Sequence, residues 1–227
     1  MAIHLPCTAP CATAPGDYAG MVMKRASIAI VGALVLAAVI WALRSRRNPT
    51  AYPYGQSVFL EMPRPFLRRA ALQEMLAPVP GERLLEIGPG TGYYTLDVAD
   101  AIGPRGRLDI LDVQQEMLDA TLRRAGENRV CNVFPTQGDA RALPYLDATF
   151  DAAFLVATLG EAPDKDAVLG ELRRVLKPSG RLVVGEGQPD PHMVRFPVLR
   201  ERAAAAGFQF EERTGGRLGF LARFRAA

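Results

Sequence analysis

The sequence is poor in the residues that usually mark a disulfide framework or a nucleic-acid surface. It has only three cysteines, and Lys and Arg total 27 against 24 Asp and Glu. Two of the cysteines lie in a Pro/Ala-rich N-terminal stretch, so they form no pairable framework, and we expect a reducing compartment. No lysine-rich face stands out, so we do not expect the partner to be a nucleic acid.

Metal-binding residues are equally scarce. The one conceivable set of ligands is His4, Cys7 and Cys11, near the N-terminus. Three candidates on a stretch without a hydrophobic pattern do not make a structural metal site. We therefore expect no metal.

One long apolar run stands near the N-terminus. From Ala26 to Leu43 the sequence reads "ASIAIVGALVLAAVIWAL", with Lys24 and Arg25 before it and three arginines within the next four residues. Its length is close to the minimum for crossing a ~30 Å hydrocarbon layer. A buried helix of a soluble core is rarely apolar on every face and bracketed by cations. The run predicts a transmembrane helix, and the absence of a small-residue cleavage site argues against a signal peptide.

The sequence suggests four segments. We expect a disordered leader over 1–25, the transmembrane helix over 26–43, a Pro/Gly-containing linker over 44–63 and a globular domain over 64–227. Met21 or Met23 would give a more usual start, and the charge bias places the domain in the cytoplasm by a small margin. Apolar residues beside arginines in "VFLEMPRPFLRR" either rest on an anionic membrane interface or cover the domain's own core.

From residue 64 onward, strand-like and helix-like patterns alternate. We expect strands at 83–88, 107–112, 131–135, 150–157, 180–186, 208–213 and 218–225, and helices at 92–101, 114–125, 165–177 and 195–206. Apolar spacing in "RPFLRRAALQEMLAP" adds a further helix. Such alternation predicts an α/β fold: a mostly parallel seven-stranded sheet, helices on both faces and ligands at the carboxyl ends of the strands. The "TGG" between the last two strands predicts an antiparallel hairpin.

A glycine-rich turn follows the first strand in "LLEIGPGTGYYTLDVAD". A dinucleotide fingerprint has the spacing G-x-G-x-x-G, because its third glycine lets the helix pack close to the strand. Here Gly88, Gly90 and Gly92 have the spacing G-x-G-x-G, and Tyr93 fills the third position of the fingerprint, which argues against NAD or FAD. Glu86 would repel a pyrophosphate and suit a ligand with a cationic amine or sulfonium.

With these residues the chain resembles the class I S-adenosylmethionine-dependent methyltransferases, a Rossmann-like family, and within it the small-molecule methyltransferases of ubiquinone and menaquinone biosynthesis. The likeness rests on four motifs in order, "LLEIGPGTG", "LDILD", "QGDARALPYLDATFD" and "ELRRVLKPSGRLVV". It implies S-adenosylmethionine as the cofactor and a small-molecule acceptor, either water-soluble or lipophilic (quinone-like or lipid-like).

The resemblance also implies which residues hold the cofactor. They are Glu86, Gly88, Gly90, Gly92, Asp112, Val113, Asp139 and Ala140. In this family the glycine turn approaches the methionine part, the acid at the end of the second strand accepts from the ribose hydroxyls, and Asp139 with the backbone at Ala140 holds the adenine edge. Each residue has a plainer alternative: a tight turn for the glycines, a helix N-cap for Asp112, and a solvated loop acid for Asp139.

The acceptor side matches the family less well. Many relatives carry "LHH" or a similar pair after the fourth strand, where this chain has "TLGEAPD". Glu161 is a candidate base or acceptor-orienting group, and His192 lies where an acceptor would bind. Either residue is equally compatible with a solvated surface position, so the catalytic residues stay open.

Two functions of different class follow. The first is an enzyme that transfers a methyl group from S-adenosylmethionine to a small acceptor, which needs mainly close alignment of nucleophile and methyl carbon. The second is a membrane-tethered cofactor-binding module without catalysis. The full set of cofactor residues favours the enzyme, because a scaffold has no need to keep all of them.

Overall fold

The computed structural model describes residues 30–37, 39–40, 55, 67–188 and 190–227. The chain divides into two units, Met1–Arg44 and Ser45–Ala227. In the first unit, residues 30–37 and 39–40 are helical with exposed side chains. None of the helices in the described part of the chain is long and apolar enough to span a bilayer. The ends of the predicted span 26–43, the leader and nearly all of the linker lie outside the described residues, so these remain predictions.

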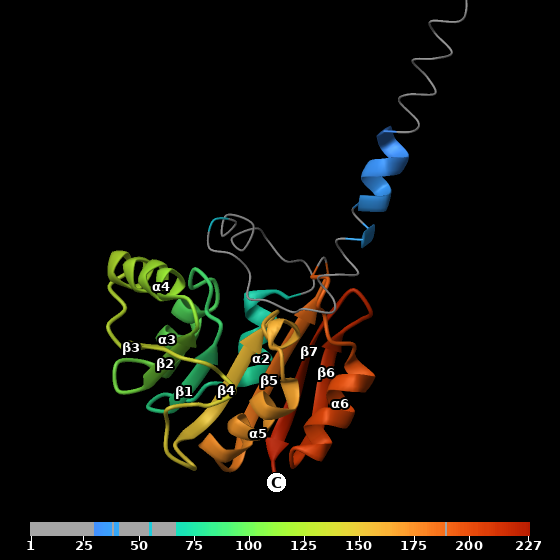
Figure 1. Cartoon of the computed structure of the whole chain (residues 1–227). Helices are drawn as coiled ribbons and strands as arrows, with labels where there is room; N and C mark the ends of the chain where they lie inside the picture. The colour runs from blue at the N-terminus through green and yellow to red at the C-terminus, as the bar shows by residue number, and fades with distance from the viewer. Residues whose placement is uncertain (1–29, 38, 41–54, 56–66, 189) are drawn as a thin grey trace, which may run out of the picture. The chain divides into compact units, whose positions relative to one another are not determined.

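Seven strands form one sheet in the order β3-β2-β1-β4-β5-β7-β6 (Figure 1). The strands are β1 Arg83–Ile87, β2 Arg107–Asp112, β3 Val133–Gln137, β4 Phe150–Val156, β5 Leu176–Gly187, β6 Phe208–Gly215 and β7 Gly219–Ala226. The first five pair in parallel, and β7 runs antiparallel to both β5 and β6. The predicted α/β fold with a C-terminal antiparallel hairpin is therefore confirmed.

Helices cover both faces of this sheet because its strand residues alternate between two apolar clusters. The helical segments are α2 Arg69–Leu76, α3 Thr95–Ile102, α4 Gln115–Glu127, η2 Leu159–Glu161, α5 Lys165–Val175 and α6 Phe196–Ala205. In β1, Leu84 joins the cluster formed with α2, α3 and α4, whereas Leu85 joins the cluster formed with α5 and α6. Successive strand residues point to opposite faces, so one apolar strand supplies both cores.

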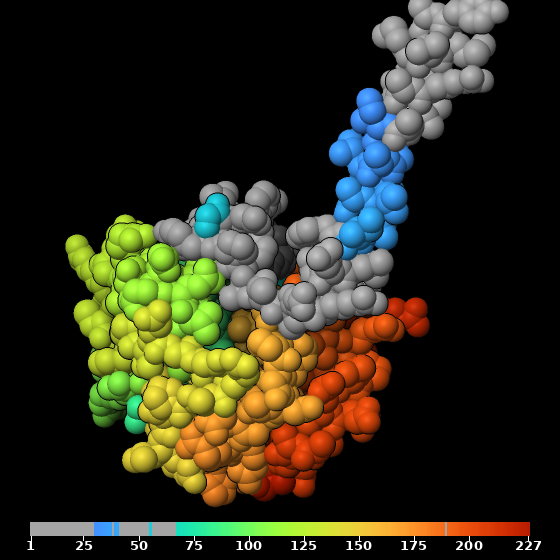
Figure 2. All heavy atoms as spheres, in the orientation of Figure 1, coloured from blue at the N-terminus to red at the C-terminus, as the bar shows by residue number. Residues whose placement is uncertain are grey.

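The two edge strands differ from the central ones. β3 carries Pro135 in its middle, and its burial pattern is mostly exposed. β6 is exposed over most of its length and its register with β7 shifts between Phe210 and Glu212. Figure 2 shows these edges on opposite flanks of the domain, with α4 in green on one side and the chain's last third in orange and red on the other.

Most element boundaries differ from the sequence prediction by a residue or two, and two starts differ by more. α3 begins at Thr95 and not at 92, because Gly92 has φ +82°, which a right-handed helix does not allow. β5 begins at Leu176 and not at 180, because Leu176 pairs with Phe150 before the register shifts and Arg181 pairs with Ala152.

One residue of the predicted membrane-facing segment belongs to the core. Leu67 is 3% exposed and packs with the apolar cluster of α2 and α3. The Tyr94 hydroxyl donates to the Leu67 carbonyl oxygen at 2.7 Å, which fixes the backbone there as well. The membrane-surface interpretation is therefore wrong for Leu67. The other apolar residues of that interpretation, Val58, Phe59, Leu60, Met62 and Phe66, lie outside the described residues.

Candidate functional site

The predicted cofactor residues gather at the carboxyl edge of the sheet. β1 lies between β2 and β4. After β1 the chain forms β2 and β3 on one side of it, and after β3 it crosses to form β4 on the other side. The carboxyl ends of the strands at such a reversal of strand order are where α/β proteins bind their ligands. The Gly88 N–H donates to the carbonyl oxygen of Leu111 at 2.8 Å, which joins the glycine turn to the end of β2.

The glycine turn needs glycine for two reasons. Gly88, Gly90 and Gly92 have φ values of +68°, +59° and +82°, in the left-handed region that side chains disfavour. A Cβ atom at Gly88 would also lie 2.5 Å from the Thr158 hydroxyl oxygen. The three glycines therefore do form a tight turn. In addition, Gly88 packs closely against the segment that follows β4.

Thr121 of α4 holds the second half of the turn. Its hydroxyl donates to the Gly90 carbonyl oxygen at 2.9 Å. A Cβ atom at Gly92 would lie 3.1 Å from the Thr121 methyl carbon, so the helix approaches closely there too. Sequence reasoning missed Thr121 and Thr158, because neither stands near the glycines in the chain.

Glu86 is buried beneath the turn. It is 2% exposed, and the Thr95 hydroxyl donates to its Oε2 at 2.6 Å. The pKa of Glu86 is raised to about 8, mainly by burial; the hydrogen bond from Thr95 lowers it and the charge of Asp112 raises it by smaller amounts. The Glu86 carboxyl is therefore neutral below that pH. For Glu86 to carry the negative charge expected from the sequence, a cation has to lie beside it.

The two tyrosines after the turn have different surroundings. Tyr94 is 5% exposed and belongs to the core. Tyr93 packs edge-to-face on Tyr94 with ring centroids 4.8 Å apart, and the Arg69 guanidinium lies 4.3 Å from the Tyr93 ring centroid. A cation thus already covers one face of the Tyr93 ring.

Asp112 ends β2 and is 9% exposed. Its Oδ1 accepts the Gln114 N–H at 2.9 Å. Burial raises the pKa of Asp112, and backbone hydrogen bonds from Gln114 and Val113 oppose this rise. The N-cap of α4 is Gln114, so the alternative of Asp112 as that helix's N-cap is wrong. Val113 beside it is apolar yet 48% exposed, which suits a surface that a ligand covers.

Asp139 follows β3, and the Gly138 N–H donates to the Asp112 carbonyl oxygen at 2.9 Å. The ends of β2 and β3 are therefore joined. The Asp139 carboxylate pairs with the Arg141 guanidinium at 2.6 Å, which holds the pKa of Asp139 below its usual value. Any ligand that bonds to this carboxylate has to share it with Arg141, a competitor that sequence reasoning missed. Ala140 packs against the core.

The two acceptor-side candidates lie on segments that touch. Glu161 ends the short η2 helix after β4, and His192 lies in the loop before α6, with its N–H donating to Asp190 Oδ1 at 2.7 Å. A Cβ atom at Gly160 would lie 2.4 Å from the His192 carbonyl oxygen. The fold thus brings the two segments into backbone contact, although they are thirty residues apart in sequence.

Glu186, near the end of β5, is a residue that sequence reasoning missed. It is fully buried, and its Oε2 accepts the Val194 N–H at 3.0 Å. Burial raises the pKa of Glu186 to about 8. A signal was present: an acid near the end of the apolar strand "RLVVGEG" repeats the pattern of Glu86 in "LLEIG".

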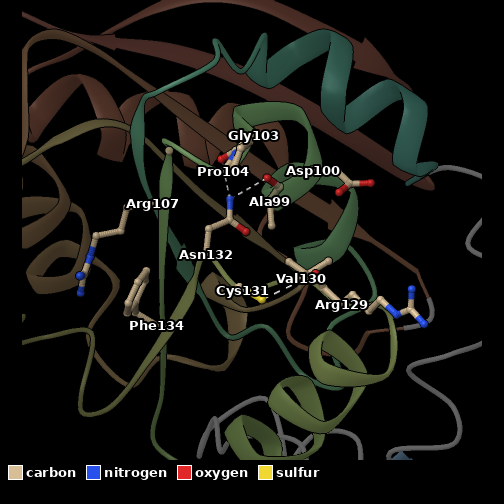
Figure 3. A pocket seen from close by; sticks show the side chains of 11 residues that line it. Ala99, Asp100, Gly103, Pro104, Arg107, Arg129, Val130, Cys131, Asn132 and Phe134 are labelled. Carbon is tan, nitrogen blue, oxygen red and sulfur yellow. Dashed lines mark hydrogen bonds between the residues drawn. The ribbon is translucent and has the colours of Figure 1, made fainter.

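The structure also has a pocket outside this site. A pocket of about 420 Å³ lies at the opposite edge of the sheet, where β2 and β3 begin, and is lined by residues such as Arg107, Asn132 and Phe134 (Figure 3). Within the described ranges no group of three or more His, Cys, Asp or Glu side chains is placed to hold a metal ion. His4, Cys7 and Cys11 lie outside those ranges.

Comparisons with known proteins agree with the fold and the glycine turn. The model of the ubiE/COQ5 methyltransferase family matches residues 62–197. A demethylmenaquinone methyltransferase from Lactococcus lactis is 35% identical over 117 residues, which is 52% of this chain and 46% of that protein. A ubiquinone/menaquinone biosynthesis C-methyltransferase from Saccharophagus degradans is 36% identical over 107 residues, 47% of this chain and 43% of that protein. The matches thus span about half the length of these curated relatives.

Solved structures are similar in fold. A SAM-dependent methyltransferase from Aquifex aeolicus superposes with a TM-score of 0.71 at 20% identity, over 78% of this chain and all of that one. The [4+2]-cyclase SpnF superposes with a TM-score of 0.63 at 23% identity, over 69% of this chain and 78% of that one. Because one of these proteins is a cyclase, the fold alone does not decide the reaction.

We expect Gly88→Ala to destabilise the domain more than Gly81→Ala. Both glycines have positive φ, but a Cβ at Gly81 meets nothing within 4 Å, whereas at Gly88 it meets Thr158. The backbone strain common to both costs about 1–3 kcal/mol, and overpacking at Gly88 adds about 1–3 kcal/mol. Urea unfolding of the two variants measures the difference. Gly88→Ala with Thr158→Ala should recover most of the added loss, and equal losses in the two single variants would contradict the close contact.

Proposed function

The chain belongs to the ubiE/COQ5 methyltransferase family, and on that basis we propose that it transfers a methyl group from S-adenosylmethionine to a small, lipophilic acceptor of the quinone type. The observation that carries the proposal is the family match over the part of the chain that forms the glycine turn and the ends of β2, β3 and β4. The quinone-type acceptor is argued from the names of the curated relatives.

The residues at the strand ends suit this cofactor. Asp112 is a largely buried carboxyl that accepts backbone N–H groups, and ribose hydroxyls would be suitable additional donors. Val113 offers an exposed apolar surface beside it for a flat base. Glu86 lies beneath the turn, where a sulfonium or amine would favour its ionised form. Asp139 and the backbone at Ala140 would hold the adenine edge.

The bound cofactor supplies an already activated methyl group. The protein then has to bind, orient and enclose the reactants, and proximity of this kind is worth about 7–11 kcal/mol. A base is needed only where the acceptor must lose a proton. Glu161 is our candidate for that base, with His192 as a second group on the same side of the site.

We also propose that the apolar run near the N-terminus attaches the enzyme to a membrane. Every described residue of that run is helical and exposed, including Ile30, Leu34 and Ile40, which are 60%, 65% and 50% exposed. A contiguous apolar surface of this kind is normally buried against lipid or protein. An acceptor that partitions into the bilayer would then meet the enzyme at its surface.

We expect Asp112→Ala to weaken binding of S-adenosylhomocysteine at least tenfold. The variant loses charge-assisted bonds worth about 1.5–3 kcal/mol each. Gly90→Val should weaken binding as well, because a β-branched residue disfavours φ +59°. Isothermal titration is the measurement, with Asp119→Ala on the exposed side of α4 as the control. Unchanged affinity in both site variants, or tighter binding of NAD, would refute the cofactor assignment.

For Glu161→Gln we expect slower methyl transfer with an unchanged dissociation constant for the cofactor, because the residue lies on the acceptor side. Transfer is followed with labelled S-adenosylmethionine and a reduced demethylmenaquinone that has a short isoprenoid tail. A tenfold or greater fall in kcat fits a base, in line with general acid–base contributions of about 10²–10⁴. Equal turnover in the variant and the wild type would make Glu161 a surface acid.

The membrane proposal predicts the side on which the domain lies. In sealed inverted vesicles from the inner membrane of a bacterial host, added protease should digest the domain, because a cytoplasmic domain faces outward there. A variant beginning at Ala51 should stay in the soluble fraction. Protection of the domain in these vesicles would reverse the topology, and full-length protein in the soluble fraction would remove the anchor.

A further inference from the structure

The carboxyl of Glu186 is fully buried on the acceptor side, and methyl transfer as proposed does not use it. The residue lies near the carboxyl end of β5, opposite Phe220 of β7 in the sheet register. Its Oε2 accepts the backbone N–H of Val194 at 3.0 Å. The backbone N–H of Gly160 also faces the carboxyl and lowers its pKa by a smaller amount than that of Val194.

These two N–H groups come from separate segments that carry the acceptor-side candidates. Gly160 directly precedes Glu161 in η2, and Val194 follows His192 by two residues. The segments also touch directly, since a Cβ at Gly160 would lie 2.4 Å from the His192 carbonyl oxygen. One side chain at the end of a rigid central strand therefore contacts both segments at the point where they meet.

We propose that Glu186 is a positioning residue of the acceptor side, whose carboxyl fixes the turn that carries Glu161 relative to the loop that carries His192. The arrangement itself does not depend on the reaction, but its importance for turnover rests on the function proposed above. The role differs from that of a catalytic group, because Glu186 is 0% exposed and acts through the backbone of its neighbours.

The chemistry of the carboxyl favours the protonated form. Its Oε1 is buried and forms no hydrogen bond with any described residue, so a negative charge on it would lack a donor. Two charged groups face it: Asp190 from the loop before α6 raises the pKa, and Lys165 from α5 lowers it by a smaller amount. Lys165 itself donates to the Ala162 carbonyl oxygen at 2.9 Å, which ties α5 to the end of η2.

Protonation makes the contact sensitive to pH. The pKa of Glu186 is raised from 4.5 to about 8, so between these values the folded protein holds a proton that the unfolded chain releases. Stability is therefore highest below pH 4.5 as far as this group is concerned, and it falls as the pH rises toward 8. Glu86 acts in the same direction, since its pKa is also about 8. Above pH 8 the ionised Glu186 is repelled by Asp190, and we expect the loop to loosen.

Hydrogen exchange of two backbone amides tests the contact in the full-length protein. In Glu186→Ala, exchange at Gly160 and Val194 should quicken at least tenfold, whereas Glu186→Gln, which keeps a neutral acceptor oxygen, should leave it unchanged. Glu201→Gln, an exposed acid on α6, is the control. Affinity for S-adenosylhomocysteine should stay within twofold of the wild type in all three variants.

The pH dependence of the His192 imidazole signal distinguishes a positioning role of Glu186 from a merely structural one. The chain has two histidines, so labelled imidazoles give a signal for His192 that a His192→Gln variant identifies. In the wild type this signal should show an inflection near pH 8, and in Glu186→Gln the inflection should be absent. With the quinol acceptor at pH 7, Glu186→Ala should lower kcat at least tenfold without raising KM for S-adenosylmethionine, and Glu186→Gln should restore kcat.

Gly160→Ala tests the same geometry if Glu186→Ala does not fold. The new Cβ would meet the His192 backbone and separate the turn from the loop, so exchange at Val194 should again quicken. Unchanged exchange at both amides in Glu186→Ala, or equal effects in Glu201→Gln, would overturn the proposal. A wild-type protein that fails to bind S-adenosylhomocysteine would instead refute the proposed function, while the exchange data would still decide the role of Glu186.

Discussion

The close contact between Gly88 and Thr158 is the constraint on which the site depends. It joins the segments that leave β1 and β4, the neighbouring strands between which the chain reverses its direction across the sheet. A side chain at Gly88 would push these segments apart and would prevent a ligand from approaching the turn closely. Thr121 of α4 holds the other half of the turn through the Gly90 carbonyl oxygen. The segments at the site are therefore held together by glycines and threonine hydroxyl groups that keep backbone close to backbone.

Most of the fold could be predicted from the sequence because its signals are local. Short apolar runs such as "RLLEI" are typical of a strand that is buried on both faces, and the glycines mark the turn within the same stretch. The positions of Glu86 and Asp112 follow, because the ends of neighbouring parallel strands meet at one edge. The start of β5 could not be predicted, since it depends on the pairing of Leu176 with Phe150 across a register shift.

The contacts that shape the site could not be predicted in the same way. Gly88 and Thr158 are seventy residues apart, and Gly160 and Val194, which both meet Glu186, are thirty-four residues apart, so no short window contains both sides of such a contact. Arg141, which pairs with Asp139, was visible in the sequence, but the pairing depends on how the loop after β3 turns back. Burial decides the chemistry of Glu86 and Glu186, and burial is a property of the packed domain.

Pro135 in the middle of β3 limits how the domain can associate with other chains. Proline has no N–H to donate, so a strand from another molecule cannot form a continuous ladder along this edge. At the opposite edge, β6 is lined by the charged residues Glu211, Glu212 and Arg213, and the register shift bends the strand there. With both edges blunted, strand addition is disfavoured as a route to dimers or fibres. A second copy or a partner protein would therefore dock on the helical faces or loops. The sheet then acts only as the scaffold of the site.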